Sequence, residues 1–291
     1  MIILSIIAII LVVGLVLGFI IILSFSKPHK RHSSTPKDEG IKFEEVSIPT
    51  KNNKRLFGWW LKAEEKAPTI ILMHGWGRNA GRLIPYIKNL QDNGFNLLAF
   101  DTRHHGNSDH DKFSSMVKFA QDISASIDFI EADPITEKDN VFLIGLSIGG
   151  AASIYAAAAD SRIKKIITIG APSNPADVMT IHIRKKHIPK PIIWLAFKVM
   201  EKRIGSSFKE LSACNNIFKT RAKVLLIHGT KDKVVPFSQS KLILNAANNG
   251  QAKLWAIEGK GHSNCHYENG FWDRVINFLS SNENTTLNNQ E

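Results

Sequence analysis

The sequence contains only two cysteines, Cys214 and Cys265. Two cysteines cannot form a disulfide framework, and this usage fits a reducing compartment. The chain also lacks the His/Cys spacing of a zinc site, a phosphate-binding loop and the glycine pattern of a dinucleotide-binding fold. We therefore expect neither a metal nor an organic cofactor.

Charged side chains are missing from residues 1–25, which are rich in Ile, Leu and Val. An apolar run of this length exceeds the ~18–20 residues that a helix needs to cross a bilayer. No basic segment precedes it, and it is longer than the ~7–15 apolar residues of a signal peptide. We expect an uncleaved transmembrane anchor over residues 1–26. A cleaved signal peptide is the alternative, because small residues at 24–26 suit a signal peptidase.

The charges after the apolar run predict its orientation. Lys27, Lys30 and Arg31 follow it directly, whereas only the amino terminus precedes it. Positively charged flanks stay on the cytoplasmic side of a membrane. The rest of the chain is therefore expected in the cytoplasm.

Composition divides the remaining chain into three parts. Residues 27–40 form a basic and polar linker, and residues 281–291 form an Asn-rich tail that we expect to be disordered. Residues 41–280 are long enough for one domain with a sizeable core and contain no internal repeat.

Strand-like apolar segments alternate with helical segments through this domain, after an early pair expected to form an antiparallel edge. This alternation predicts an α/β fold with a mostly parallel sheet and helices on both faces. The early pair lies at 43–47 and 56–61, and the later strands are expected at about 69–74, 96–101, 141–145, 164–169, 223–228 and 252–257.

The segment Gly145-Leu146-Ser147-Ile148-Gly149 lies between a strand-like segment and a run of small, helix-forming residues. A G-x-S-x-G sequence on such a strand-to-helix turn is a nucleophile elbow, which exposes the serine hydroxyl above the sheet. The helix N-terminus beside it favours developing negative charge. Ser147 is therefore the candidate nucleophile, and a plain buried helix serine is the alternative.

A serine hydroxyl needs a base to take its proton and an acid to orient that base. Asp232 follows the strand-like segment 222–229, and His262 lies in the glycine-rich loop after 252–257. The resulting order of serine, acid and histidine is that of hydrolases with this elbow. We expect Asp232 to orient His262, and His262 to act as the base.

Other residues compete for these two roles. Asp101 and Asp109 are alternative acids, and His266 is the main rival base because it lies close to His262. His228 ends a strand and is expected to pack or bond locally. Chain order argues against three histidines before the elbow as the base: His104, His105 and His110. His74 is expected to have a positional role in the oxyanion loop and no acid–base role.

The segment His74-Gly75-Trp76-Gly77 follows the expected strand at 69–73. In this architecture one oxyanion donor is the backbone N–H after the nucleophile, and the other comes from the loop after this strand. We expect the backbone N–H groups of Ile148 and Trp76 to stabilise a tetrahedral intermediate.

These motifs together resemble the α/β-hydrolase superfamily over about residues 41–280. The turn 100–108 adds to the resemblance, because it is similar to the D-x-R-G-H-G-x-S turn of the family, with His104 in place of the first glycine. The pattern is most similar to single-domain serine hydrolases of the monoglyceride-lipase and serine-aminopeptidase type. The resemblance implies a lid formed by the insertion at about 173–221.

Much of the net charge of +11 is concentrated in this insertion, where basic residues such as Lys185, Lys186 and Lys190 outnumber acidic ones. The apolar run 192–200 lies between these basic groups. A basic amphipathic segment is typical of membrane-surface binding. The alternative is a lid helix with its apolar face on the core. No nucleic-acid reader motif is visible, so no nucleic-acid partner is expected.

The sequence thus predicts a membrane-anchored serine hydrolase that cleaves carboxylic ester or thioester bonds through an acyl-enzyme. Its expected substrate is a small-molecule acyl ester, including lipid-like esters. Two alternatives stay open: an acyltransferase with the same three residues, and a non-catalytic, membrane-tethered binding or scaffold protein.

Overall fold

The computed structural model describes residue 12 and residues 14–23, 30–184 and 187–281. Most of the expected anchor (1–26) and tail (281–291) lies outside these residues, as do Lys185 and Lys186. Within the described residues, no helix has both the length and the apolar character needed to cross a bilayer. Residues 14–23 are helical.

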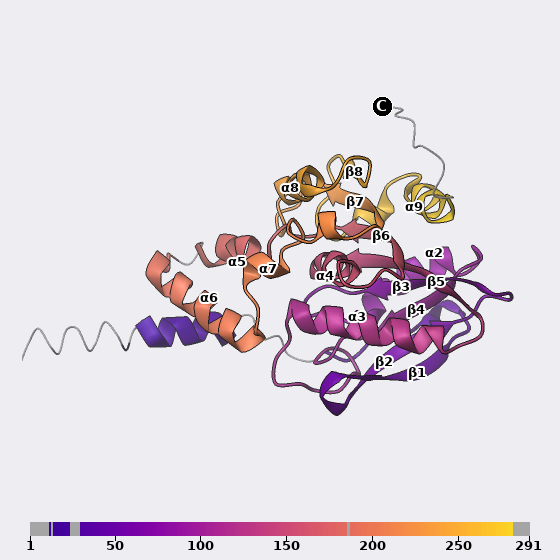
Figure 1. The fold of residues 1–291 in the computed structure, drawn as a ribbon, viewed down its shortest axis with the longest axis horizontal. Coiled ribbons are helices and arrows are strands. Elements are labelled where there is room, and N and C mark those ends of the chain that lie inside the picture. The colour runs from indigo at the N-terminus through magenta and orange to yellow at the C-terminus, as the bar shows by residue number, and fades with distance from the viewer. Residues whose placement is uncertain (1–11, 13, 24–29, 185–186, 282–291) are drawn as a thin grey trace, which may run out of the picture.

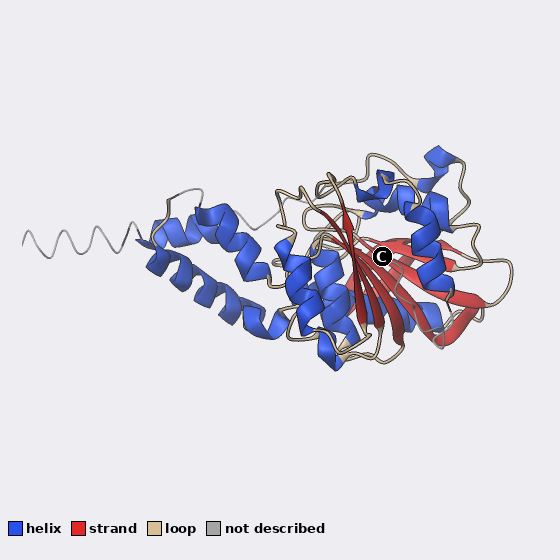
Figure 2. Ribbon diagram, turned by 90° about the horizontal axis from the view of Figure 1, so that it is seen from above, coloured by secondary structure: helices blue, strands red, loops and turns tan. Residues whose placement is uncertain are grey.

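One eight-stranded sheet forms the centre of the molecule (Figures 1 and 2). Its strand order is β1-β2-β4-β3-β5-β6-β7-β8. The pairs β1–β2 and β2–β4 are antiparallel and all other pairs are parallel, which confirms the expected mostly parallel sheet with an antiparallel edge. The strands are β1 (Glu44–Thr50), β2 (Lys54–Leu61), β3 (Ala67–Met73), β4 (Asn96–Phe100), β5 (Thr136–Leu146), β6 (Ile163–Ile169), β7 (Lys223–Gly229) and β8 (Ala252–Ile257).

Helices cover both faces of the sheet, as the alternating pattern predicts. Helices α3, α4 and α8 contribute to one apolar cluster, and α2 and α9 contribute to the other. The helices are α2 (Ile84–Leu90), α3 (Met116–Glu131), α4 (Ile148–Ala157), α5 (Pro175–Arg184), α6 (Lys190–Ile204), α7 (Phe208–Leu211), α8 (Ser238–Ala246) and α9 (Phe271–Ser280).

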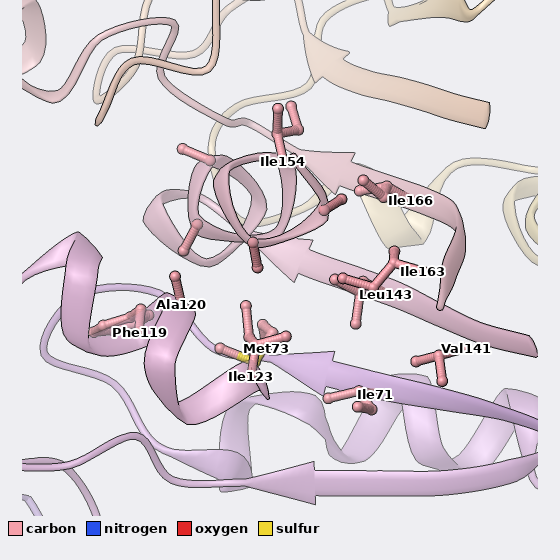
Figure 3. Packing of buried hydrophobic residues seen from close by; sticks show 14 of the residues in the cluster. Ile71, Met73, Phe119, Ala120, Ile123, Val141, Leu143, Ile154, Ile163 and Ile166 are labelled. Atoms are coloured by element: carbon pink, nitrogen blue, oxygen red, sulfur yellow. The ribbon is translucent and has the colours of Figure 1, made fainter. Parts of the chain in front are cut away.

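The two clusters arise because successive side chains of a strand point to opposite faces. In β3, Ile71 and Met73 pack with α3 and α4 (Figure 3), whereas Ile70 and Leu72 pack with the cluster on the other face. All four side chains are fully buried. A strand buried on both faces must be apolar throughout, and this explains the continuous apolar run in the sequence.

The insertion between β6 and β7 carries α5, α6 and α7, and α6 projects away from the sheet (Figure 1). The helical residues 14–23 lie beside α6 in both views (Figures 1 and 2). Ile21 of this segment shares a small apolar cluster with Ile183 of α5 and Ile193 of α6. The described N-terminal segment and the insertion therefore pack as one unit.

Residues 30–40, expected as a linker, pack onto the domain. The side chain of His32 is only 5 % exposed, and its Nε2 lies 2.8 Å from Oδ2 of buried Asp101. Its ring also lies 4.7 Å from the Trp59 ring, measured between centroids. Asp101 in turn accepts the N–H groups of Ala80 and Asn107, each at 2.7 Å. This contact ties the segment before the domain to the turn after β4.

The turn after β4 forms although His104 replaces the glycine of the family pattern. His104 has a φ of 69°, in the left-handed region, and its N–H donates to Asp109 O at 2.9 Å. A residue with a side chain costs about 1–2 kcal/mol in this conformation. The surrounding turn therefore holds His104 against an unfavourable backbone angle.

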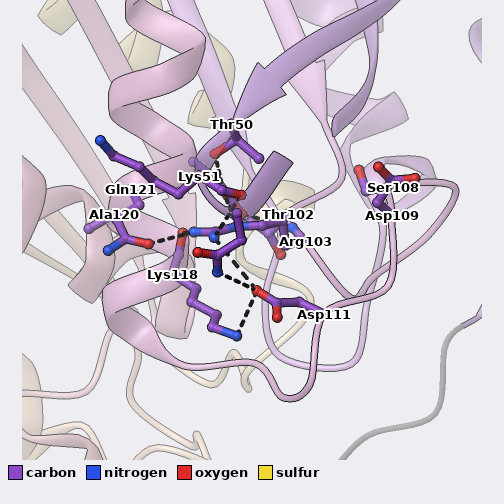
Figure 4. A network of polar contacts seen from close by, with 12 residues as sticks. Thr50, Lys51, Thr102, Arg103, Ser108, Asp109, Asp111, Lys118, Ala120 and Gln121 are labelled. Atoms are coloured by element: carbon purple, nitrogen blue, oxygen red, sulfur yellow. Dashed lines mark hydrogen bonds and ion pairs between the residues drawn. The ribbon is translucent and has the colours of Figure 1, made fainter. Parts of the chain in front are cut away.

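The neighbouring Arg103 is fully buried and holds a polar network beneath this turn (Figure 4). Its Nε donates to Asp122 Oδ1 at 2.7 Å, and the backbone N–H of Arg103 donates to Asp122 Oδ2 at 2.8 Å. Gln121 accepts from Arg103 Nη2 at 2.7 Å. Asp111 lies 3.6 Å from Arg103 Nη1 and 2.7 Å from Lys118 Nζ. Each buried charge thus has a partner of opposite sign.

The first prediction concerns this network. Arg103→Met removes the partner of buried Asp122, and an uncompensated buried charge is expected to lower the free energy of unfolding by about 3–5 kcal/mol. Urea unfolding followed by circular dichroism measures the change. Arg55→Met is the matched control, because Arg55 is exposed and a surface change stays within about 0.5 kcal/mol. Equal small losses in both variants would contradict the structural role of Arg103.

Candidate active site

Ser147 lies at the junction of β5 and α4 with φ 55° and ψ −123°. This positive φ is a strained angle for a residue with a side chain and costs on the order of 1–3 kcal/mol. Its backbone N–H donates to Ile169 O at 2.8 Å, so the end of β6 holds the turn. The strained strand-to-helix turn that the sequence predicts is therefore present.

Glycines allow α4 to start directly against the sheet. A Cβ at Gly145 would lie 2.4 Å from the backbone N of Gly150, and a Cβ at Gly149 would lie 2.5 Å from His74 O. Both distances are far below van der Waals contact. The motif's glycines are therefore required for the packing of α4 as well as for the turn itself.

Asp232 and His262 meet beyond the ends of β7 and β8. His262 Nδ1 donates to Asp232 Oδ2 at 2.7 Å, and Asp232 Oδ1 accepts the N–H groups of Val234 at 2.8 Å and Val235 at 2.9 Å. Because a carboxylate only accepts, we assign the proton to Nδ1. The other ring nitrogen, Nε2, is then left as a base.

A second histidine contacts the same carboxylate. His228 Nε2 lies 3.3 Å from Asp232 Oδ2 and 2.9 Å from Val235 O, while its Nδ1 pairs with the Ser240 hydroxyl. Burial alone would raise the pKa of Asp232. The hydrogen bonds from His228 and His262 outweigh burial and hold the pKa well below its usual range. Asp232 is thus ionised at neutral pH.

Ser147 and His262 line one cavity of about 630 Å³. A Cβ built at Gly75 would lie 3.3 Å from Ser147 Cβ, and one at Gly170 would lie 3.0 Å from His262 Nδ1 and 3.3 Å from Asp232 Oδ2. Gly170 directly follows the residue that accepts the Ser147 N–H. Ser147 therefore lies beside the loop after β3, and His262 and Asp232 lie beside the residue that follows β6.

The alternative acids lie elsewhere. Asp101 is bonded to His32 and to the turn after β4, and Asp109 Oδ2 accepts the Arg55 N–H at 2.8 Å. The rival base His266 lines the same cavity, but its ring contacts the Tyr86 and Tyr267 rings in a tilted arrangement, and in the part of the chain that the structure describes it pairs with no carboxylate. Within the described residues, Asp232 is thus the carboxylate that pairs with His262.

The two expected oxyanion donors flank Ser147. Ile148 is the first residue of α4, where a helix leaves its N–H groups without intrahelical acceptors. Trp76 lies in a turn closed by the Arg78 N–H, which donates to Gly75 O at 3.2 Å. Trp76 and Ile148 both line the cavity.

His74 fixes the loop that carries Trp76. Its Nδ1 donates to Gly75 O at 2.8 Å, and its Nε2 accepts the Thr102 N–H at 3.1 Å. Burial lowers the pKa of His74, which keeps the ring neutral. A neutral ring can make both bonds at once, so His74 has a positional role, as the sequence predicts.

The wall of the cavity has an apolar part and a polar part. One part is apolar and comes largely from the insertion, including Val178 and Met179 of α5 and Met200 of α6. Ile22, from the helical residues 14–23, belongs to the same wall. Another part carries Arg82 and His266. Sequence reasoning named His266 only as a rival base and gave Arg82 no role, because Arg82 belongs to no catalytic motif.

This arrangement has the parts needed for acyl transfer: a strained serine that lines the cavity, a histidine oriented by a carboxylate, and N–H groups at a helix N-terminus. Of the sequence-predicted residues, Ser147, His262, Trp76 and Ile148 line one cavity, and Asp232 is hydrogen-bonded to His262. His228 was expected to bond locally, and its additional contact with Asp232 comes from a four-residue spacing around a turn.

Gly170→Ala gives the second prediction. The new Cβ would lie 3.0 Å from His262 Nδ1 at a backbone φ of 65°. Displacing His262 from Asp232 is expected to lower the rate of Ser147 labelling by a fluorophosphonate probe at least ~10²-fold. Gly94→Ala is the matched control, because Gly94 has a φ of 73° and no atom within 4 Å of the added Cβ. Equal labelling of both variants would argue against this geometry.

Comparison with known proteins identifies the family. The family model described as serine aminopeptidase, S33, matches residues 64–209. The uncharacterized membrane protein YNL320W of Saccharomyces cerevisiae is 23% identical over 258 residues, covering 88% of this chain and 86% of the yeast protein. The thiohydrolase aneE of Aspergillus aculeatus is 28% identical over 138 residues, covering 46% of this chain and 43% of that protein.

A solved structure shares the fold over most of the chain. The esterase Pf2001 of Pyrococcus furiosus superimposes with a TM-score of 0.71 at 22% identity, covering 88% of this chain and 96% of the esterase. This likeness establishes the α/β-hydrolase fold.

Proposed function

The chain belongs to the serine aminopeptidase, S33, family of α/β-hydrolases, and we propose that it is a serine hydrolase that cleaves carboxylic esters or thioesters. One observation carries the proposal. Strained Ser147 lines the same cavity as His262, and the His262 ring is hydrogen-bonded to Asp232. A scaffold protein has no need for this combination.

The proposed reaction has two halves. Ser147 Oγ attacks the acyl carbon while His262 Nε2 takes the hydroxyl proton, and the carbonyl oxygen becomes an oxyanion held by the Trp76 and Ile148 N–H groups. The bond to the leaving oxygen or sulfur then breaks, and His262 gives its proton to that atom. Water attacks the acyl-enzyme by the same route, releasing the acid and restoring Ser147.

Asp232 supports this cycle by electrostatics. When His262 takes a proton it becomes an imidazolium cation, and an ionised carboxylate 2.7 Å from Nδ1 stabilises that charge. The bonds from Val234, Val235 and His228 keep Asp232 ionised and fixed. Esters and thioesters are favoured over amides, because amide leaving groups are harder to expel. Similarity to a thiohydrolase supports the thioester option.

The insertion is proposed to act as a lid that rests on a membrane. Trp194, Leu195 and Val199 of α6 are 62 %, 46 % and 46 % exposed, so this helix presents several large apolar side chains to solvent. Lys198 and Lys202 belong to the same helix, and apolar residues flanked by basic ones suit an anionic lipid surface. The insertion also packs against the helical residues 14–23.

Residues 1–26 are proposed to anchor the chain, with the domain in the cytoplasm. The apolar run continues into the described helical residues 14–23, whose Leu15, Phe19 and Leu23 are more than half exposed. The positive charges at 27–31 favour this orientation. The yeast relative, which its name describes as a membrane protein, supports a membrane location.

Ser147→Ala provides the third prediction. Loss of the nucleophile is expected to lower the turnover of a short-chain p-nitrophenyl ester at least ~10³-fold and to abolish fluorophosphonate labelling. Ser124→Ala on α3 should retain both activities, since Ser124 lies outside the cavity lining. Retained turnover in pure Ser147→Ala protein would remove Ser147 from the mechanism. Product analysis with an added alcohol separates hydrolysis from acyl transfer.

A fourth prediction tests the membrane surface. Leu195→Glu places a charge on the exposed face of α6 and is expected to lower turnover of an acyl ester embedded in anionic vesicles several-fold, with turnover of a soluble ester unchanged. Leu242→Glu is the control, because Leu242 is similarly exposed at 47 % but lies on α8. Equal effects of both variants on vesicle turnover would contradict a membrane-facing insertion.

A further inference from the structure

The cavity around Ser147 carries positive charge without a matching negative charge. Its described lining contains three arginines, Arg78, Arg82 and Arg203, and neither an aspartate nor a glutamate. Arg203 has local partners, because its Nη2 donates to Lys112 O at 3.2 Å and its guanidinium lies 4.5 Å from the centre of the Phe113 ring. A wall of this composition favours an anionic group on the bound molecule.

Arg82 is held beside the proposed base. Its Nη2 donates to Ser263 O at 2.6 Å, and Ser263 directly follows His262. The acceptor is a neutral carbonyl, so this bond leaves the guanidinium charge uncompensated. In the proposed mechanism His262 protonates the leaving group, which must therefore lie on the side of the cavity that Arg82 borders.

His266 adds a polar atom without a partner. Its side chain lines the cavity and the residue is 5 % exposed, and within the described residues its Nε2 has no hydrogen-bond partner. Burial, and then the nearby charge of Arg82, lower the pKa of His266 to about 4. The ring is therefore neutral at pH 7. A buried polar atom without a partner is uncommon in folded proteins.

We propose that Arg82 and His266 form a subsite for an oxyanion, either a phosphate or a carboxylate, carried by the leaving group of the substrate. The guanidinium offers two parallel N–H donors to such a group, and neutral His266 can donate one more. The apolar wall with Val178, Met179 and Met200 then accommodates the acyl chain. The substrate class is an acyl ester or thioester with an apolar acyl part and an anionic leaving group, and this assignment rests on the proposed function.

The test compares three chromogenic esters with the full-length chain. Two are butyrate esters, one of 4-nitrophenol and one of 3-carboxy-4-nitrophenol, so that they differ by one carboxylate on the leaving group. The third, the 4-nitrophenyl monoester of glutaric acid, carries its carboxylate on the acyl side. Each is measured with Arg82→Gln, Arg82→Lys and His266→Phe. Arg55→Gln is the matched control, because Arg55 is an exposed arginine outside the cavity lining.

Arg82→Gln is expected to lower kcat/KM about 10- to 100-fold for the ester with the anionic leaving group, mainly through KM. Turnover of the other two esters should stay within about twofold. Arg82→Lys should give an intermediate loss, because it keeps the charge without the paired donors. His266→Phe should act in the same direction, with a loss of about 5- to 10-fold. Arg55→Gln should leave all three rates unchanged.

The outcomes separate this subsite from the proposed function. Failure of the wild-type chain to hydrolyse any ester would reject the proposed function itself. If Arg82→Gln lowers kcat/KM equally for all three esters, the role of Arg82 is to position Ser263, and the subsite is overturned. A loss confined to the glutarate ester would move the anionic group to the acyl side and also overturn it.

Competition against the neutral ester distinguishes the two oxyanions. Phenyl phosphate and benzoate are the probes, and phenol is the uncharged control. The subsite requires that at least one anion inhibits the wild-type chain competitively and that Arg82→Gln weakens this inhibition about tenfold or more. The stronger inhibitor identifies phosphate or carboxylate. Inhibition that is equal for phenol and both anions would overturn the proposal.

Discussion

The close contact between the start of α4 and the sheet determines the position of Ser147, and the other groups of the site are arranged around that contact. Gly145 and Gly149 let the helix approach the strand ends to within distances that no side chain would permit. The Ser147 N–H is held by β6 through Ile169, and Gly170 then lies against the pair formed by His262 and Asp232. Because a few glycines have no side chain, groups at the ends of four strands can come close together.

Local patterns in the sequence predicted much of this arrangement. Continuous apolar runs such as 69–73 indicated strands buried on both faces, and glycines around Ser147 indicated the elbow. The order of Ser147, Asp232 and His262 along the chain was informative because parallel strands bring their carboxyl ends to one edge. The turn at His104 also forms, since its surroundings compensate for the unfavourable backbone angle.

Other features depend on contacts between residues that are distant in sequence, and no local pattern reveals them. His32 lies in a segment whose polar composition suggests a linker, yet it is buried against Asp101. Arg82 belongs to a short helical segment far from His262 in the chain, and only the folded structure brings it to Ser263 O. The side chains of the insertion that face the cavity could not be chosen from periodicity, because its helices pack partly on residues 14–23.

The contact between His32 and Asp101 has a practical consequence for recombinant work. Asp101 also accepts the N–H groups of Ala80 and Asn107, so it connects the amino-terminal segment to the segment between β3 and α2 and to the turn after β4. Expression of the chain from residue 41 onward would delete His32 and remove a hydrogen-bond partner of the buried Asp101 carboxylate. Trimming of the amino terminus for crystallisation should therefore stop before residue 30, so that the protein retains the contact between His32 and Asp101.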